Sequence, residues 1–171
     1  MHTNTKALVL AGGGAKGSYQ VGVFRGLREV GWRPGIVTGT SVGSLNGALL
    51  VMDRLEEAEQ LWLTLDIHGV LETPKSSKPE ELRAFLLKVL RSGGLNIDPL
   101  GGTIDEYLDE ERMRAAPTRY GLVMTEMNTL KSHQYTLEEI PRGRLKEYMM
   151  ASSACFPALR PQEIDGVKYI D

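Results

Sequence analysis

The chain has 171 residues, about the size of one domain, and its hydrophobic (42%) and charged (25%) fractions exclude a disordered tail or a collagen-like rod. Twenty basic and 22 acidic residues leave a net charge of −2, so no general attraction to nucleic acid is expected. The single cysteine, Cys155, excludes an internal disulfide framework. Neither a signal-peptide pattern nor an apolar run of about 18 residues is present, so we expect a cytoplasmic protein.

The first 52 residues alternate between strand and helix patterns. The apolar run 7–11, stopped by three glycines, predicts a buried strand. Apolar residues at helical spacing then predict a helix from about residue 18 to its end at Gly31. The β-branched run 36–38 predicts a second buried strand, followed by a helix through about Met52. This order predicts a parallel sheet covered by helices.

The middle of the chain is mostly helical in pattern. Helices are predicted at 55–65 and 79–91, with a loop at 74–79 between them. The polar face of the helix at 79–91 carries both charge signs, which favours packing on the core over peripheral membrane contact. Glycines at both ends predict a flexible loop at 92–102, and the capping-box pattern of 103–106 predicts that another helix begins there.

The last third returns to strands around one helix. The predicted elements are strands at 119–127 and 133–137, a helix at about 143–153, and a hairpin of 163–164 and 167–171 around Asp165-Gly166. The chain stops at Asp171, at the end of a strand, where parallel-sheet enzymes place their chemistry. We therefore expect the natural protein to continue beyond Asp171.

The segment Gly39-Thr40-Ser41-Val42-Gly43 matches the pattern G-x-S-x-G. In that pattern a serine nucleophile sits in a sharp strand-to-helix turn, and small residues are needed on both sides because the two backbones nearly touch. A β-branched strand precedes the motif and an apolar helix follows it, so Ser41 is a candidate nucleophile at a helix N-terminus. The alternative is a tight turn in which Ser41 only caps the helix.

A glycine loop, Gly12-Gly13-Gly14-Ala15-Lys16-Gly17, follows the first predicted strand. It matches the dinucleotide-binding pattern, but no acidic residue stands about 20 residues further on, and the Gly-Lys-Ser/Thr order of a phosphate-binding loop is absent. Its N–H groups also suit an oxyanion hole, because adjacent parallel strands would bring Ser41 beside it. A tight turn without a ligand is the third interpretation.

A serine nucleophile needs a base to accept its proton. His2, His68 and His133 are each more typical of solvent-facing or core-filling side chains, although His133 follows Ser41 in an order that suits a triad. A carboxylate held against the serine can replace histidine, and Asp171 is the best-placed candidate. Asp165 is the rival, but it stands at the predicted hairpin tip.

Together these motifs resemble the patatin-like phospholipase family. The resemblance is carried by Gly12 to Gly17, by Gly39 to Gly43, by Ala151-Ser152-Ser153-Ala154 with Phe156-Pro157, and by Asp171. It implies one patatin-like acyl hydrolase domain over residues 1–171, with a three-layer α/β/α fold and a mostly parallel central sheet.

The resemblance also implies the chemistry. Ser41 would be the nucleophile and Asp171 the base of a Ser–Asp dyad, Gly12, Gly13 and Gly14 would form the oxyanion hole, and Lys16, Gly17, Gly39 and Gly43 would support these motifs. The substrate would be a lipid or phospholipid ester, hydrolysed without a metal or other cofactor. Independently of the resemblance, the glycine-rich composition of residues 92–102 predicts a lid over the acyl site. A nucleotide-binding domain and a triad esterase using His133 are the alternatives, and the oligomeric state is open.

Overall fold

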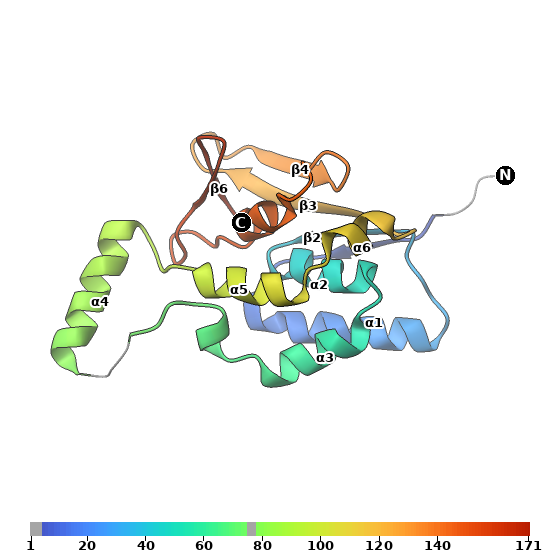
Figure 1. Ribbon diagram of the computed structural model, residues 1–171, viewed down its shortest axis with the longest axis horizontal. Helices are drawn as coiled ribbons and strands as arrows, with labels where there is room; N and C mark the ends of the chain where they lie inside the picture. The colour runs from blue at the N-terminus through green and yellow to red at the C-terminus, as the bar shows by residue number, and fades with distance from the viewer. Residues whose placement is uncertain (1–4, 75–77) are drawn as a thin grey trace.

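The computed structural model describes residues 5–74 and 78–171, and Figure 1 shows a sheet with helices packed against it. The strands are β1 (Ala7–Leu10), β2 (Ile36–Thr40), β3 (Arg119–Glu126), β4 (Ser132–Thr136), β5 (Gln162–Ile164) and β6 (Val167–Ile170). The helices are α1 (Gly17–Glu29), α2 (Val42–Val51), α3 (Leu55–Thr64), α4 (Pro79–Ser92), α5 (Asp98–Tyr107), α6 (Glu110–Ala115) and α7 (Leu145–Ser152). Two 3-10 turns, η1 (Gly14–Lys16) and η2 (Ile67–Gly69), complete the elements.

The sheet is mixed, with most of its strands pointing the same way. β1, β2 and β3 pair in parallel, β6 runs antiparallel to β3, and β5 runs antiparallel to β6. β5 therefore points in the direction of β1, β2 and β3, whereas β4 and β6 point the other way. The predicted α/β class with a mostly parallel central sheet is confirmed.

One edge of β3 is shared by two strands that meet end to end. Gly121 pairs with β2 and with β4, so those two strands lie on opposite edges of β3. Thr125 pairs with β4 and with β6, so β6 lies on the same edge as β2. β2 ends opposite Val123 and β6, running the opposite way, ends opposite Thr125. The residues that follow the two strands therefore reach the same level of the sheet, beside Met124.

Helix α2 occupies the centre of the molecule. It contacts β1, β2 and β3 as well as the helices α1, α3 and α7. Nine of its ten residues are buried, which is why its sequence, from Val42 to Val51, lacks the polar face of a surface helix. Its N-terminus follows β2 directly, so the candidate nucleophile Ser41 stands where the sheet meets the core.

The predicted loop at 92–102 is wrong in its second half. Helix α5 begins at Asp98, with Pro99 in its first turn, where a missing N–H costs no hydrogen bond. Gly101 lies inside this helix, where a Cβ would come within 3.2 Å of the end of the Lys146 side chain on α7. Thr103 is therefore not a helix cap, and its hydroxyl donates to the carbonyl of Gly69 at 2.7 Å.

Two predictions of burial are also wrong. Helix α4 forms as predicted and ends at Gly93 in the left-handed conformation, but it has no buried residue, and Leu90 is 77% exposed. Figure 1 shows α4 standing away from the sheet, so its apolar stripe does not pack on the core. Strand β1 is an edge strand of which only Leu10 is buried, and Val9 is 77% exposed.

The remaining expected elements are present, and α6 is an additional helix that the sequence analysis did not predict. The turn between β5 and β6 has positive φ at both Asp165 (51°) and Gly166 (79°), as a two-residue hairpin requires. Residues 75–77 of the predicted loop at 74–79 lie outside the described residues, as does His2. Among the helices that the structure describes, none is long and apolar enough to cross a membrane.

Candidate active site

Ser41 sits in a strained turn between β2 and α2. Its φ is 54° and its ψ is −131°, a conformation that non-glycine residues rarely adopt. The neighbouring glycines permit the turn: a Cβ on Gly39 would lie 2.2 Å from the Gly43 carbonyl oxygen, and one on Gly43 would lie 2.3 Å from the Leu10 carbonyl oxygen. The geometry expected of a nucleophile elbow is therefore present, with Ser41 7% exposed.

The end-to-end meeting of β2 and β6 brings Ser41 and Asp171 together. Each residue directly follows its strand, so both lie at the level of Met124 on one edge of β3. A Cβ atom placed on Gly12 would lie 3.8 Å from the hydroxyl oxygen of Ser41 and 3.8 Å from a carboxylate oxygen of Asp171. Two residues that are 130 positions apart in the sequence and the glycine loop thus converge on one place.

The C-terminal end of α7 holds both of these strand ends in place. Ser152 is fully buried, and its hydroxyl accepts a hydrogen bond from the Ser41 N–H at 3.0 Å and donates one to the Val123 carbonyl at 2.6 Å. Two residues later, the Ala154 carbonyl accepts from the Asp171 N–H at 3.0 Å. These bonds give the Ala-Ser-Ser-Ala segment a physical role that sequence reasoning did not assign.

The glycine loop runs from the end of β1 past Ser41. Gly13 and Gly14 have positive φ values of 152° and 54°, and both line the cavity described below. Among the described residues, the N–H groups of Gly12, Gly13 and Gly14 donate to no backbone carbonyl. They are therefore available to an external acceptor.

The two loop residues that follow have different surroundings. Lys16 is exposed at the start of α1 and does not line the cavity. Gly17 is buried, and a Cβ on it would lie 2.5 Å from the Val42 side chain and 2.6 Å from the Trp62 ring. Gly17 therefore allows α1 to approach α2 and α3 closely.

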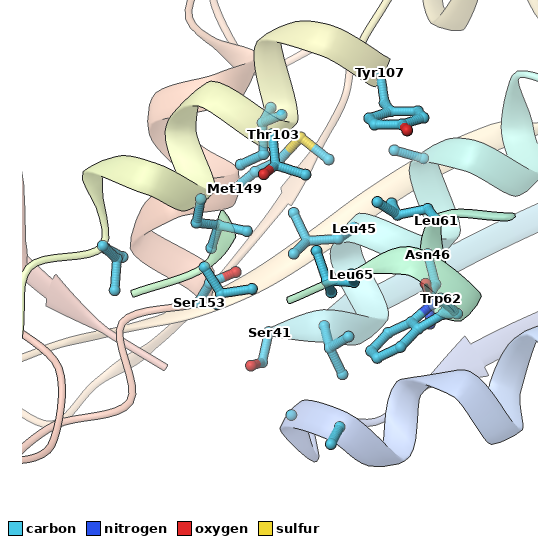
Figure 2. A pocket seen from close by; sticks show the side chains of 18 of the residues that line it. Ser41, Leu45, Asn46, Leu61, Trp62, Leu65, Thr103, Tyr107, Met149 and Ser153 are labelled. Carbon is cyan, nitrogen blue, oxygen red and sulfur yellow. Dashed lines mark hydrogen bonds between the residues drawn. The ribbon is translucent and has the colours of Figure 1, made fainter. Parts of the chain in front are cut away.

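A cavity of about 760 Å³ opens beside Ser41 and follows one face of α2. Its lining residues on and around this helix recur at helical spacing, at Ser41, Leu45, Leu49 and Met52. The opposite walls are apolar side chains of α3, η2, α5 and α7: Leu61, Trp62, Leu65, Ile67, Val70, Leu71, Ile97, Leu100, Ile104, Tyr107, Leu108 and Met149. Figure 2 shows Ser41 at one end of this space and Tyr107 at the other.

The side of the cavity near α1 carries a buried polar network that the sequence did not reveal. The Asn46 amide donates to the Gly17 carbonyl and to the Gln20 side chain, both at 2.9 Å, and its oxygen accepts from the Trp62 indole at 2.9 Å. Asn46 is 2% exposed, so its polar atoms need these partners. The signal available in the sequence was an asparagine inside a mostly apolar helix.

The other candidate residues lie elsewhere. His133 is on β4 opposite Met124, with Tyr135 and Tyr169 around its ring, and it does not line the cavity. His68 is exposed beside Thr73, and Asp165 is bound to Arg144, whose hydrogen bond lowers the pKa of that carboxyl. Within residues 5–74 and 78–171, no cluster of three His, Cys, Asp or Glu side chains could hold a metal ion.

With this geometry established, comparison with known proteins identifies the family. The family model described as patatin-like phospholipase matches residues 8–171, which is nearly the whole chain. The chain belongs to the patatin-like phospholipase family. The resemblance inferred from the motifs is thereby confirmed, and the family assignment favours lipid ester hydrolysis over nucleotide binding.

Individual relatives match over short segments. Patatin-like phospholipase domain-containing protein 7 of Rattus norvegicus is 51% identical over 51 residues, which are 30% of this chain and 4% of that protein. Lysophospholipase nte1 of Aspergillus terreus is 54% identical over 46 residues, 27% of this chain and 3% of that protein. The chain therefore corresponds to a small part of the length of these curated relatives.

A solved structure supports the fold. The chain is similar to VipD from Legionella pneumophila, with a TM-score of 0.64 and 17% sequence identity, over 98% of this chain and 45% of VipD. At this level of identity the likeness shows a shared patatin-like α/β/α fold, with a sheet flanked by helices.

Proposed function

We propose that this protein hydrolyses the acyl esters of lipids, of the phospholipase A or lysophospholipase type, with Ser41 as nucleophile and Asp171 as base. The observation that carries the proposal is the convergence of the Ser41 hydroxyl, the Asp171 carboxylate and the glycine loop at one end of an apolar cavity. Family membership supports a lipid substrate, and the apolar lining of the cavity suits a hydrocarbon chain.

The proposed reaction has two steps. Asp171 accepts the proton of the Ser41 hydroxyl as its oxygen attacks the acyl carbonyl, and the N–H groups of Gly12 to Gly14 stabilise the oxyanion. The bond between the acyl carbon and the alcohol oxygen then breaks, the alcohol leaves with the proton that Asp171 had accepted, and an acyl-enzyme remains. Water, deprotonated by Asp171, attacks the acyl-enzyme, and the fatty acid is released as Ser41 recovers its proton.

The test is hydrolysis of chromogenic acyl esters by the wild type, Ser41→Ala and Asp171→Asn. Both variants are expected to lose at least about 1000-fold in kcat, because nucleophile and base act as a unit. Asp165→Asn is the matched control, since it makes the same change on the same hairpin, and it should keep the wild-type rate. Labelling of the wild type, but not of Ser41→Ala, by a fluorophosphonate probe gives a second readout. Wild-type turnover by Ser41→Ala would refute the proposal.

A further inference from the structure

Ser153 presents a buried hydroxyl that the protein itself does not use. The residue is 6% exposed, and its Oγ has no hydrogen-bond partner among the described residues. Its neighbour Ser152 differs, because that hydroxyl is engaged by both the Ser41 N–H and the Val123 carbonyl. A buried hydroxyl without a partner costs free energy, so its presence in a folded protein asks for an explanation.

The location of Ser153 supplies one. Ser153 lines the cavity together with Ser41 and Asp171, and Figure 2 shows it at the Ser41 end. It is also fixed there, because the residues on either side of it, Ser152 and Ala154, hold the backbones of Ser41 and Asp171. Ser153 thus lies where the reacting group of a substrate would sit, at the opposite end of the cavity from Tyr107.

Two other polar side chains of the cavity wall, those of Thr103 and Asn46, have partners in the protein. The Thr103 hydroxyl donates to the Gly69 carbonyl at 2.7 Å, and the Asn46 amide is satisfied within its network. Hydrocarbon offers nothing to a hydroxyl, whereas both oxygens of an ester accept hydrogen bonds. The chemistry that fits Ser153 is therefore the ester group and not the chain.

We propose that Ser153 is a substrate-binding residue whose hydroxyl donates a hydrogen bond to the ester of the bound lipid. The inference rests on the proposed function and adds to it a residue that recognises the ester. A site built to hydrogen-bond one group of its ligand disfavours ligands that lack the group. Ser153 would thus help the cavity to select esters over purely hydrocarbon ligands.

The experiment measures binding without turnover, in the Ser41→Ala background. Trp62 lines the cavity and reports occupancy by its fluorescence, with Trp32 replaced by Phe to remove the second indole. The ligands are methyl octanoate and a chloroalkane of the same length, which has no oxygen acceptor. Ser153→Ala is expected to weaken binding of the ester about five- to tenfold, which is the effect of one hydrogen bond, and to leave the affinity for the chloroalkane unchanged.

Thr103→Val is the matched control, because it removes a cavity hydroxyl that already has a partner. It is expected to lower the melting temperature and to leave the preference for the ester intact. Ser153→Ala is expected to leave the melting temperature unchanged or to raise it, since no internal hydrogen bond is lost.

Two results would overturn the role of Ser153. One is an equal affinity for the ester with and without the Ser153→Ala change, and the other is a lowered melting temperature together with weaker binding of both ligands. In either case, ester hydrolysis dependent on Ser41 leaves the proposed function standing. If neither ligand binds to any variant, the cavity is not an acyl-binding site, and both proposals fail.

Discussion

The shape of the cavity predicts how long an acyl chain the protein accepts. From Ser41 to Met52 the cavity follows eleven residues, which at 1.5 Å each span about 16 Å along α2. An extended peptide advances about 3.6 Å over its three backbone bonds, and an extended acyl chain likewise advances about 1.2 Å per bond. A cavity length of about 16 Å therefore holds an acyl chain of roughly 13 bonds. Each buried methylene contributes about 0.8 kcal/mol, or about fourfold in kcat/KM. We expect kcat/KM to rise with chain length up to about that limit and then to stop rising.

Tyr107 is the residue at which this limit can be moved. It lies at the end of α5, and its backbone carbonyl accepts a hydrogen bond from Arg54 at 2.9 Å, a contact that side-chain replacement leaves intact. Close by, the Asp109 N–H donates to the sulfur of Met52 at 3.4 Å, and Met52 also lines the cavity. Tyr107→Ala should therefore extend the preferred chain by roughly two to four carbons, and Tyr107→Phe, which keeps the ring, should not.

A second variant tests the same geometry from the other end. Leu45 lines the cavity one turn from Ser41, about 6 Å along the helix axis, so Leu45→Trp should restrict the enzyme to chains of roughly five bonds. The assay is kcat/KM across a series of chromogenic esters from four to eighteen carbons. An unchanged length profile in both Tyr107→Ala and Leu45→Trp would show that the acyl chain does not follow α2.

Three further predictions concern stability and the alternative base. Gly43→Ala should cost about 4 kcal/mol or more in thermal unfolding because its Cβ would strike a carbonyl of β1, whereas Gly22→Ala, in open space, should be neutral or slightly stabilising. The pKa of Glu110 is below its ordinary value: burial acts to raise it, but hydrogen bonds, first that of Arg114, outweigh burial. That stabilisation is present above about pH 4.5 and is lost as the pH falls through the lower folded pKa, so the melting temperatures of wild type and Glu110→Gln should converge as the pH is lowered below 4.5. His133→Ala should retain ester hydrolysis; its loss would favour a triad.

Local pattern predicted much of the site because the required features are local. A β-branched run, two glycines at fixed offsets from a serine and an apolar helix specify the turn at Ser41 without knowledge of the rest of the chain. Parallel pairing of β1 with β2, which places Leu10 beside Gly39, then brings the glycine loop to the serine as predicted. Asp171 was placed at a strand end by the same kind of argument.

Burial and long-range pairing were less accessible to sequence reasoning. The apolar period of α4 correctly indicates a helix with one apolar face, but periodicity does not say what covers that face, and here Leu86 and Leu90 are exposed. The start of α5 was missed because Gly101 and Gly102 suggested a loop, whereas both lie inside the helix, the first of them beside α7. The hydrogen bonds of Ser152 join segments 111 and 29 residues apart, beyond the reach of any local pattern.

The meeting of β2 and β6 would make two such short side chains sufficient for the dyad that we propose. Serine and aspartate each extend only two or three bonds from the backbone, so a dyad of the two requires that their backbones approach closely. A sheet ordinarily separates neighbouring strands by about 4.8 Å and alternates the direction of side chains, which restricts such approaches. When two antiparallel strands end against the same edge of a third, the residues after both ends occupy one level without competing for its hydrogen bonds. Because α7 then fixes both backbones, through Ser152 and Ala154, the separation of hydroxyl and carboxylate depends on the fold and little on loop conformation.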